Sequence, residues 1–441
     1  MMKKTLLGLF ILAIILFIIV LAFAFWPTKT PPIATEPINS ALVARGQYIA
    51  VASDCTACHT APQGKLFAGG LGMASPIGTI YSTNITPDKQ TGIGHYTLSD
   101  FDRAVRHGIR PDGLTLYPAM PYPSYVRLSD EDVRALYAYF MQGVSPVQAE
   151  NRATGIPWPL SIRWPLNIWR KLFAPSVDVK FDAKQYPSPE IARGAYLVQA
   201  SGHCGSCHTP RLLTMQEKTL TDYGSNGAHY LAGGQVIDGW FTSNLRADLA
   251  TGLGSWSEKD IVDTLKTGRN QHHTVIGSPM NDVVIHSTQN MSDADLKAIA
   301  AYLKTLTPSK ESKASYTADD AMAKALYAGK NPTHGAALYV DNCAGCHRSD
   351  GQGYARVFPS IANNPSVLSD NPISMIRLIL TGSTLPQTHT APSDLSMPGF
   401  AQRLSDDDVA QLATFIRQNF GNHASSVDSS QVHSVRKTLK Q

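Results

Sequence analysis

The residues of this chain that could do chemistry are concentrated in three short motifs. All six cysteines fall in Cys-x-x-Cys-His sequences, which leaves none for a structural disulfide. The motifs are Cys55-Thr56-Ala57-Cys58-His59, Cys204-Gly205-Ser206-Cys207-His208 and Cys343-Ala344-Gly345-Cys346-His347. A bare Cys-x-x-Cys also occurs in zinc sites and redox dithiols, but a His directly after the second cysteine indicates c-type haem. On one helical turn two thiols can add to the two haem vinyl groups while the imidazole faces the iron. The sequence therefore predicts three covalently bound haem c groups.

Each haem iron needs a second axial ligand, and a methionine recurs at the same place after each motif. Met120, Met280 and Met397 each lie beside a proline in an irregular segment. Thioether and imidazole together are a common cytochrome c ligand pair and raise the potential relative to two imidazoles. The alternatives are that these are core methionines, or that histidines serve instead. The competing histidines are His95, His107, His272, His273, His286 and His389. His203, directly before Cys204, is expected to be a helix-surface residue.

Each motif is bracketed by two predicted helices. The first helix carries a glycine that either allows close helix approach or marks a simple turn; these glycines are Gly46, Gly194 and Gly335. The second helix begins with a Ser-x-x-Asp capping box, at Ser129, Ser292 and Ser405. Apolar residues then follow at i, i+3, i+4 and i+7. One helical unit is therefore used three times.

These repeats predict an all-α fold of three tandem class I cytochrome c domains behind an N-terminal apolar helix. The expected domains are 41–145, 188–307 and 327–421, with linkers at 146–187 and 308–326 and a disordered polar tail at 422–441. Copies one and two share loops that copy three lacks, such as Ser82-Thr83-Asn84-Ile85 and Thr242-Ser243-Asn244-Leu245. In copy three the Pro359 carbonyl could accept the N–H of the His347 imidazole. Pro76 is the candidate in copy one, and copy two has no obvious proline there.

The N-terminus directs the chain out of the cytoplasm. Lys3 and Lys4 precede an unbroken apolar run from Leu6 to Trp26, and about 20 such residues span a bilayer. Ala22-Phe23-Ala24 could also serve as the cleavage site of a signal peptide. Residues 1–26 are thus a signal peptide or a membrane anchor, and in both cases the rest of the chain is exported.

Composition excludes several classes of function. The net charge of +4 with only 16% charged residues argues against a nucleic-acid partner. At 43% hydrophobic residues the chain is not disordered. The sequence holds no dinucleotide fingerprint, P-loop or nucleophile elbow, so no catalytic residue for oxidation of an organic substrate is expected.

The segment from Ile156 to Phe173 is rich in aromatic and basic residues and contains Trp158, Trp164 and Trp169. Such a composition is typical of an element that lies at a membrane surface. The alternative is a strap between domains that packs on copies one and two.

From about residue 41 to 420 the chain resembles the tri-haem cytochrome c subunits of bacterial membrane-bound dehydrogenases. The resemblance is carried by the three haem motifs together with the segments Tyr81–Pro87, Thr91–Gly94 and Tyr117–Tyr122. It implies that a separate large subunit, a quinoprotein or a flavoprotein, oxidises an alcohol, gluconate or a related polyol or aldehyde. The cytochrome then passes electrons to ubiquinone, on the periplasmic side of the inner membrane. Family members commonly carry a cleaved leader. A stand-alone, membrane-attached shuttle to a terminal oxidase is the alternative.

Overall fold

The computed structural model describes residues 2–271, 276–309 and 315–439. Their contacts divide the chain into two units, residues 1–50 with 58–181 and residues 51–57 with 182–441. The second unit contains copies two and three together.

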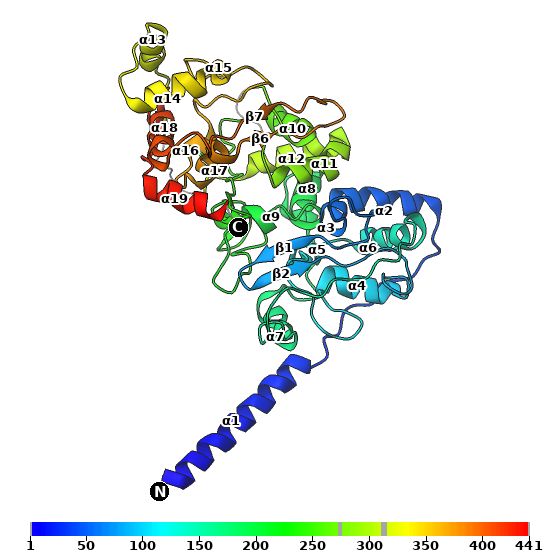
Figure 1. The fold of residues 1–441 in the computed structure, drawn as a ribbon. Coiled ribbons are helices and arrows are strands. Elements are labelled where there is room, and N and C mark those ends of the chain that lie inside the picture. Colours follow the sequence, from blue (N-terminus) through cyan, green and yellow to red (C-terminus); the bar gives the residue numbers. More distant parts are fainter. Residues whose placement is uncertain (1, 272–275, 310–314, 440–441) are drawn as a thin grey trace. The chain divides into compact units, whose positions relative to one another are not determined.

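The first unit is helical with one short ribbon (Figure 1). Its helices are α1 (Met2–Phe25), α2 (Ser40–Ala52), α3 (Cys55–His59), α4 (Leu98–His107), α5 (Tyr122–Tyr125), α6 (Asp130–Ala138) and α7 (Trp164–Phe173), of which α2 and α3 run across the boundary to the second unit. Strands β1 (Gly72–Ser75) and β2 (Gly78–Tyr81) pair antiparallel, with Gly72 opposite Tyr81. A π-helical turn, Tyr139–Gly143, extends α6.

The second unit repeats this plan twice. Copy two has α8 (Pro189–Tyr196), α9 (Gly205–His208), α10 (Glu258–Thr267), α11 (Met280–His286) and α12 (Asp293–Thr305), with β3 (Val236–Ile237) paired to β4 (Trp240–Phe241). Copy three has α13 (Ala321–Tyr327), α14 (His334–Asn342), α15 (Ala344–His347), α16 (Pro365–Leu368), α17 (Ile373–Thr381), α18 (Asp406–Gln418) and α19 (Ser429–Thr438). Its ribbons are β5 (Ser315–Tyr316) with β8 (Asn422–His423) and β6 (Ser383–Thr384) with β7 (Ser396–Met397). The prediction of a helical protein is confirmed, and the short ribbons are an addition to it.

The glycines of the repeat lie where the helix before each Cys-x-x-Cys-His motif crosses the closing helix that begins after a capping serine. A Cβ built on each would collide with a backbone carbonyl oxygen: at 1.9 Å from Ala135 for Gly46, 1.9 Å from Ala298 for Gly194 and 2.5 Å from Gln411 for Gly335. Since real Cβ atoms do not approach backbone oxygen so closely, only glycine fits. The close-approach interpretation is correct, and the simple-turn alternative is wrong.

A charged contact accompanies each crossing. The residue before the glycine binds the Asp in the first turn of the closing helix: Arg45 with Asp132, Arg193 with Asp295 and His334 with Asp408, each at 2.8 Å. The same three aspartates donate their backbone N–H to the capping serines predicted at the helix starts. Each closing helix is therefore held at its N-terminus by its capping serine and by the helix that carries the crossing glycine.

The tail after copy three contains helix α19, so the expectation of a disordered segment over residues 422–441 is wrong for residues 429–438. Residues 440 and 441 lie outside the described residues. The side chain of Asp428 caps α19, and Val432 and Val435 are buried in the hydrophobic core of copy three. Arg436 donates from Nε to Asp406 at 2.6 Å, at the start of α18. Two valines one turn apart supply the apolar stripe that the polar composition of the tail obscured.

Candidate functional site

The three Cys-x-x-Cys-His motifs each form a single helical turn. In copies two and three the backbone N–H of the His donates to the carbonyl of the first Cys, at 2.9 Å in both His208→Cys204 and His347→Cys343. In copy one the whole motif is α3. No disulfide joins any of the six cysteines, all of which lie in the described residues. This is the arrangement in which two thiols and an imidazole can face one ligand.

The imidazole of each motif is fixed by a backbone carbonyl. The Nδ1 atoms of His59, His208 and His347 donate to the carbonyls of Thr83 at 2.7 Å, Ser243 at 2.8 Å and Pro359 at 2.9 Å. A bond at Nδ1 sets the tautomer and the ring orientation and leaves Nε2 as the ligand atom. The prediction for Pro359 is confirmed, whereas Pro76 is wrong for copy one.

The acceptors missed in copies one and two lie in the loop that these copies share. Thr83 and Ser243 occupy the same position in Ser82-Thr83-Asn84-Ile85 and Thr242-Ser243-Asn244-Leu245. The repetition of this loop was a signal, but a carbonyl acceptor has no side-chain signature. The role of the loop therefore appears only when its position beside the imidazole is known.

A glycine brings this loop against each motif. Gly69 N–H donates to the His59 carbonyl at 2.7 Å, and Gly233 N–H donates to the His208 carbonyl at 2.6 Å. Both glycines have positive φ, and a Cβ on Gly69 would lie 2.4 Å from the Thr83 carbonyl carbon. In this left-handed backbone region glycine is the unstrained residue. A backbone hydrogen bond from this glycine thus contributes to holding each motif beside its imidazole acceptor.

In copy one the loop is also locked by a buried amide. Asn84 is 2% exposed. Its Nδ2 donates to Thr91 Oγ1 at 3.0 Å and to the Val147 carbonyl at 2.7 Å, and its Oδ1 accepts from Thr86 N–H at 2.9 Å. Because a buried amide is costly unless it is satisfied, this network specifies one loop conformation.

Burial sets the protonation of the motifs. It lowers the pKa of the His59, His208 and His347 imidazoles, against the opposing effect of their carbonyl bonds. It raises the pKa of the Cys204 and Cys343 thiols to about 12. Neutral imidazoles oriented through Nδ1, each following two cysteines on one helical turn, fit covalent attachment and axial ligation of a haem.

The predicted methionines lie in three kinds of local structure. Met120 is in a turn, where its N–H donates to Tyr117 and its carbonyl accepts from Tyr122. Met280 is the first residue of α11. Met397 ends β7 and packs against the hydrophobic core of copy three, to which Cys343 also belongs. All three side chains are half-buried, and their role as iron ligands stays a prediction.

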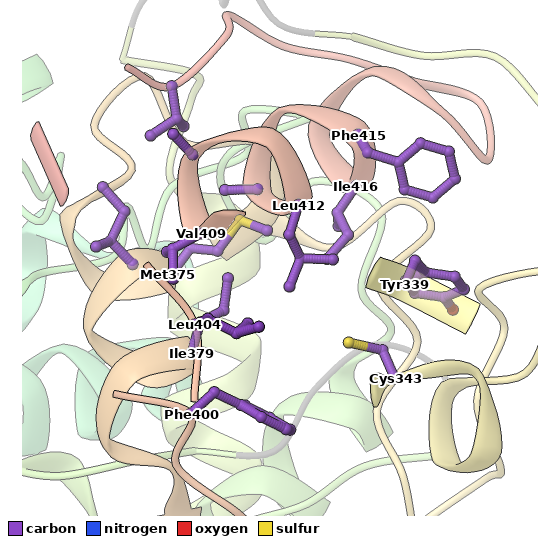
Figure 2. Close-up of a cluster of buried hydrophobic side chains, with 14 of the residues drawn as sticks. Tyr339, Cys343, Met375, Ile379, Phe400, Leu404, Val409, Leu412, Phe415 and Ile416 are labelled. Atoms are coloured by element: carbon purple, nitrogen blue, oxygen red, sulfur yellow. The ribbon is translucent and has the colours of Figure 1, made fainter. Parts of the chain in front are cut away.

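In copy three the first cysteine of the motif, Cys343, belongs to this core. Figure 2 shows the Cys343 side chain directed toward the cluster that contains Phe400 and Leu404. Tyr339, fully buried, lies beside Cys343 and packs on Phe415 with ring centroids 5.6 Å apart. Apolar surroundings of this kind are one of the means by which a protein tunes haem potential.

Among the competing histidines, His107 is buried and faces Asp102, with His107 Nε2 3.7 Å from the carboxylate. Burial and nearby arginines lower the pKa of His107 to about 4. His95 and His389 are exposed, and His286 is the last residue of α11. His272 and His273 lie outside the described residues.

His203 is not the helix-surface residue that was expected. It precedes α9 with a positive φ of 37°, and its ring is hydrogen-bonded to the backbone of Ser53. Burial lowers the pKa of His203 to about 4. Ser53 lies two residues before Cys55, in the segment 51–57 that packs with the second unit. His203 therefore connects the residues that precede two different haem motifs.

Comparison with known proteins follows the same three-part pattern. The family model described as "Cytochrome c" matches residues 43–143, 191–307 and 332–420. The chain is 51% identical to the gluconate 2-dehydrogenase cytochrome c subunit of Pantoea cypripedii, over 95% of each chain. It is also 51% identical to the cytochrome c subunit of the quinone-type alcohol dehydrogenase of Gluconobacter oxydans, over 91% of this chain and 84% of that one. The fructose dehydrogenase cytochrome subunit of Gluconobacter japonicus is 40% identical, over 94% of this chain and 86% of the relative.

Proposed function

Because the chain belongs to the cytochrome c family, we propose that it is an electron-transfer subunit with three haem c groups that delivers electrons from a dehydrogenase to ubiquinone. The observation that carries this proposal is the threefold recurrence of two cysteines on one helical turn with an imidazole bonded at Nδ1 to a backbone carbonyl. A haem bound in this way supplies a one-electron carrier, whose iron alternates between the ferric and ferrous states.

The residues of the chain have distinct roles in this proposal. The six cysteines attach the haems covalently, and His59, His208 and His347 are the proximal ligands. Met120, Met280 and Met397 are the second ligands, which favours high potentials. The carbonyls of Thr83, Ser243 and Pro359 orient the imidazoles, and burial keeps the imidazoles neutral. The domains that carry these sites are 41–145, 188–307 and 327–421.

The partner is a large subunit that oxidises the substrate. The relatives are named as cytochrome subunits of gluconate, alcohol and fructose dehydrogenases, and this chain matches them over most of its length. We infer a quinoprotein or flavoprotein partner whose substrate is an alcohol, gluconate or a related polyol or aldehyde.

The site of action is the periplasmic face of the inner membrane. Among the described residues, α1 is long and apolar enough to cross a bilayer, and almost all of its side chains are exposed. Lys3 and Lys4 at its start favour a cytoplasmic N-terminus. The haem-binding copies then lie outside the cytoplasm, where thiols are attached to haem and where the dehydrogenase works.

Haem counting tests the number of groups. The haem-to-protein ratio of the purified chain should be three, and it should fall to two when both cysteines of one motif are replaced by serine. The matched control is Ser201→Ala, outside all three motifs. A haem-to-protein ratio below three in the unaltered chain would contradict the proposal, provided that the expression host attaches haem faster than it makes the chain.

Affinity purification from gently solubilised membranes tests the partner. We expect a stoichiometric large subunit with pyrroloquinoline quinone or flavin, and substrate-dependent reduction of ubiquinone. Repeated recovery of the cytochrome alone would favour a shuttle to a terminal oxidase. Replacing Met120, Met280 or Met397 with Ala, one at a time, should remove one third of the thioether-to-iron absorption and lower one potential.

A further inference from the structure

Helix α7 binds the end of α1 directly. Lys171 Nζ donates to three carbonyl oxygens there, at 2.5 Å from Phe23, 3.2 Å from Ala24 and 2.7 Å from Trp26. The last carbonyls of a helix lack partners within the helix and carry partial negative charge. Earlier in α1, the ring of Phe17 packs edge to face against the ring of Trp164, the first residue of α7, with centroids 6.4 Å apart. The ammonium of Lys171 therefore caps the apolar helix at the point where the chain leaves it.

Helix α7 is also fixed to copy one. Asn167 and Arg170 are buried, with 4% and 9% of their surface exposed. Asn167 Oδ1 accepts from Thr115 N–H at 2.9 Å, and Arg170 donates to Thr115 Oγ1 at 3.3 Å and to Thr28 Oγ1 at 2.7 Å. Helix α7 is thus a rigid connection between α1 and the rest of the first unit.

The remaining surface of this segment is apolar and exposed. The exposed fraction is 81% for Trp158, 55% for Leu160, 41% for Ile162 and 59% for Leu172. Single exposed apolar residues need no explanation, but a group of large ones on one segment marks an interaction surface. This group is attached to the end of α1, where Trp26 is also 73% exposed.

We propose that the Trp158–Phe173 segment is an interfacial element, which lies in the headgroup layer of the bilayer that α1 crosses. It inserts the four exposed apolar side chains, while Lys171 stays at headgroup depth. The occupant of this surface is lipid rather than a protein, because the surface is continuous with the apolar helix and aromatic and basic side chains are those that membrane interfaces favour. The proposal rests on the proposed function in that α1 is taken as the membrane span.

The proposal gives copy one a defined position. Since Thr28 and Thr115 are bonded to the same Arg170, the start of the exported chain and copy one cannot separate from α7 without breaking buried hydrogen bonds. Copy one is then held at the membrane surface by two elements, α1 and the interfacial segment. Of the two earlier interpretations of Ile156–Phe173, the membrane-surface element is the one we adopt.

Photolabelling of the full-length, haem-loaded chain tests the proposal. The chain is reconstituted in vesicles of phosphatidylcholine and phosphatidylglycerol that contain a diazirine-bearing phosphatidylcholine, and labelled residues are mapped by mass spectrometry. We expect label on Trp158, Leu160 and Leu172 in addition to α1. Leu213 and Leu249, which are 103% and 74% exposed in the second unit, serve as exposed apolar references and should remain unlabelled.

The outcomes separate the two proposals. Label on α1 without label on residues 158–172 overturns the interfacial element and leaves the anchor intact. Label on residues 158–172 without label on α1 supports the interfacial element and contradicts the anchor. Label at Leu213 and Leu249 equal to that at Trp158 overturns the interfacial element, because contact with lipid is then nonspecific.

A variant adds a second measurement. The triple replacement Trp158→Ser, Leu160→Ser and Leu172→Ser removes exposed apolar surface only, so haem content should be unchanged. Labelling of the 157–173 peptide should fall about fivefold or more, since three of the side chains that enter the bilayer are lost, while labelling of α1, which holds α7 in place, is unchanged. The control Leu213→Ser with Leu249→Ser should leave both unchanged. Undiminished labelling of the peptide in the triple variant would overturn the proposal.

Discussion

Copies two and three lie in the same unit and follow one plan, but they complete it differently. In copy two, a loop after the haem motif supplies Ser243 as the imidazole acceptor, and Arg193 binds the first turn of the closing helix. Copy three lacks that loop, uses Pro359 and binds its closing helix with His334. Both copies thus place a backbone carbonyl at the imidazole and a side chain at the first turn of the closing helix, but different residue types supply these contacts.

Copy three continues past its closing helix into a tail that packs on it. Arg417 on α18 is fully buried, and its guanidinium donates to the carbonyls of Val367 at 2.6 Å, Ser369 at 3.0 Å and Ser425 at 2.7 Å. The chain after Ser425 then returns as α19 against α18 and α17. The two copies therefore share the helix crossing at the glycine of the repeat and the Cys-x-x-Cys-His motif. The loops and helices that pack around these two features differ between the copies.

The largest effect is expected at the crossing glycines. Gly194→Ala places a methyl group 1.9 Å from the Ala298 carbonyl oxygen, whereas Gly335→Ala places it 2.5 Å from that of Gln411. Forced separation of packed helices should destabilise copy two by about 3 kcal/mol or more and copy three by less. Thermal unfolding followed by circular dichroism and haem absorption measures the difference.

The control for this prediction is Gly345→Ala. No atom lies within 4 Å of a Cβ at Gly345, and the equivalent position of the first motif is Ala57. This variant should unfold like the unaltered chain. A Gly335→Ala protein less stable than Gly194→Ala would show that crossing distance does not set the order.

A second effect should appear in copy three alone. Val432 on α19 is fully buried, so Val432→Ala should cost copy three about 2 kcal/mol through lost burial and the cavity left behind. Hydrogen exchange should then rise in α18 and remain unchanged in α12. Val340→Ala, at a side chain 37% exposed, is the control and should have little effect. Unchanged exchange in α18 would mean that the tail helix does not support copy three.

A third, smaller effect concerns the stability of copy three at acid pH. The hydrogen bonds from His334 and Ser405 lower the pKa of Asp408 below its ordinary value of 3.8. A carboxyl with a lowered folded pKa adds stability above pH 3.8 that is lost as the pH falls through the folded value. Because both partners are partly exposed, the contribution is about 0.5 kcal/mol.

Asp408→Asn should therefore remove part of the loss of stability of copy three below about pH 4. Hydrogen exchange in α18 as a function of pH measures it. Asp341→Asn, an exposed residue on α14, is the control and should retain the full acid response. If the two variants have the same pH profile, the contact between His334 and Asp408 contributes nothing measurable.

Sequence patterns predicted the parts of the fold that depend on side-chain identity. The haem motifs, the capping serines, the crossing glycines and the Pro359 acceptor follow from residue types at fixed spacing. The acceptors Thr83 and Ser243 could not be predicted, because any residue has a carbonyl. The bond between His203 and Ser53 joins residues far apart in the chain, so no local pattern predicts it. Helix α19 was missed because its polar residues outnumber the two valines that dock it.

The smallest effect is expected for a variant that distinguishes the role of the Pro359 ring from the role of the Pro359 carbonyl. If the imidazole of His347 needs only the carbonyl of residue 359, Pro359→Ala should keep the haem, the Nδ1 bond and the absorption spectrum, because alanine supplies the same acceptor. Ser243→Ala should likewise leave the second site unchanged. Redox titration of the haems checks both variants, and shifts of no more than about 30 mV, about 0.7 kcal/mol for one electron, are expected. A large shift of the potential for Pro359→Ala but not for Ser243→Ala would mean that the ring of Pro359 fixes the loop of copy three. In copy two the hydrogen bond from Gly233 N–H to the His208 carbonyl holds the corresponding loop.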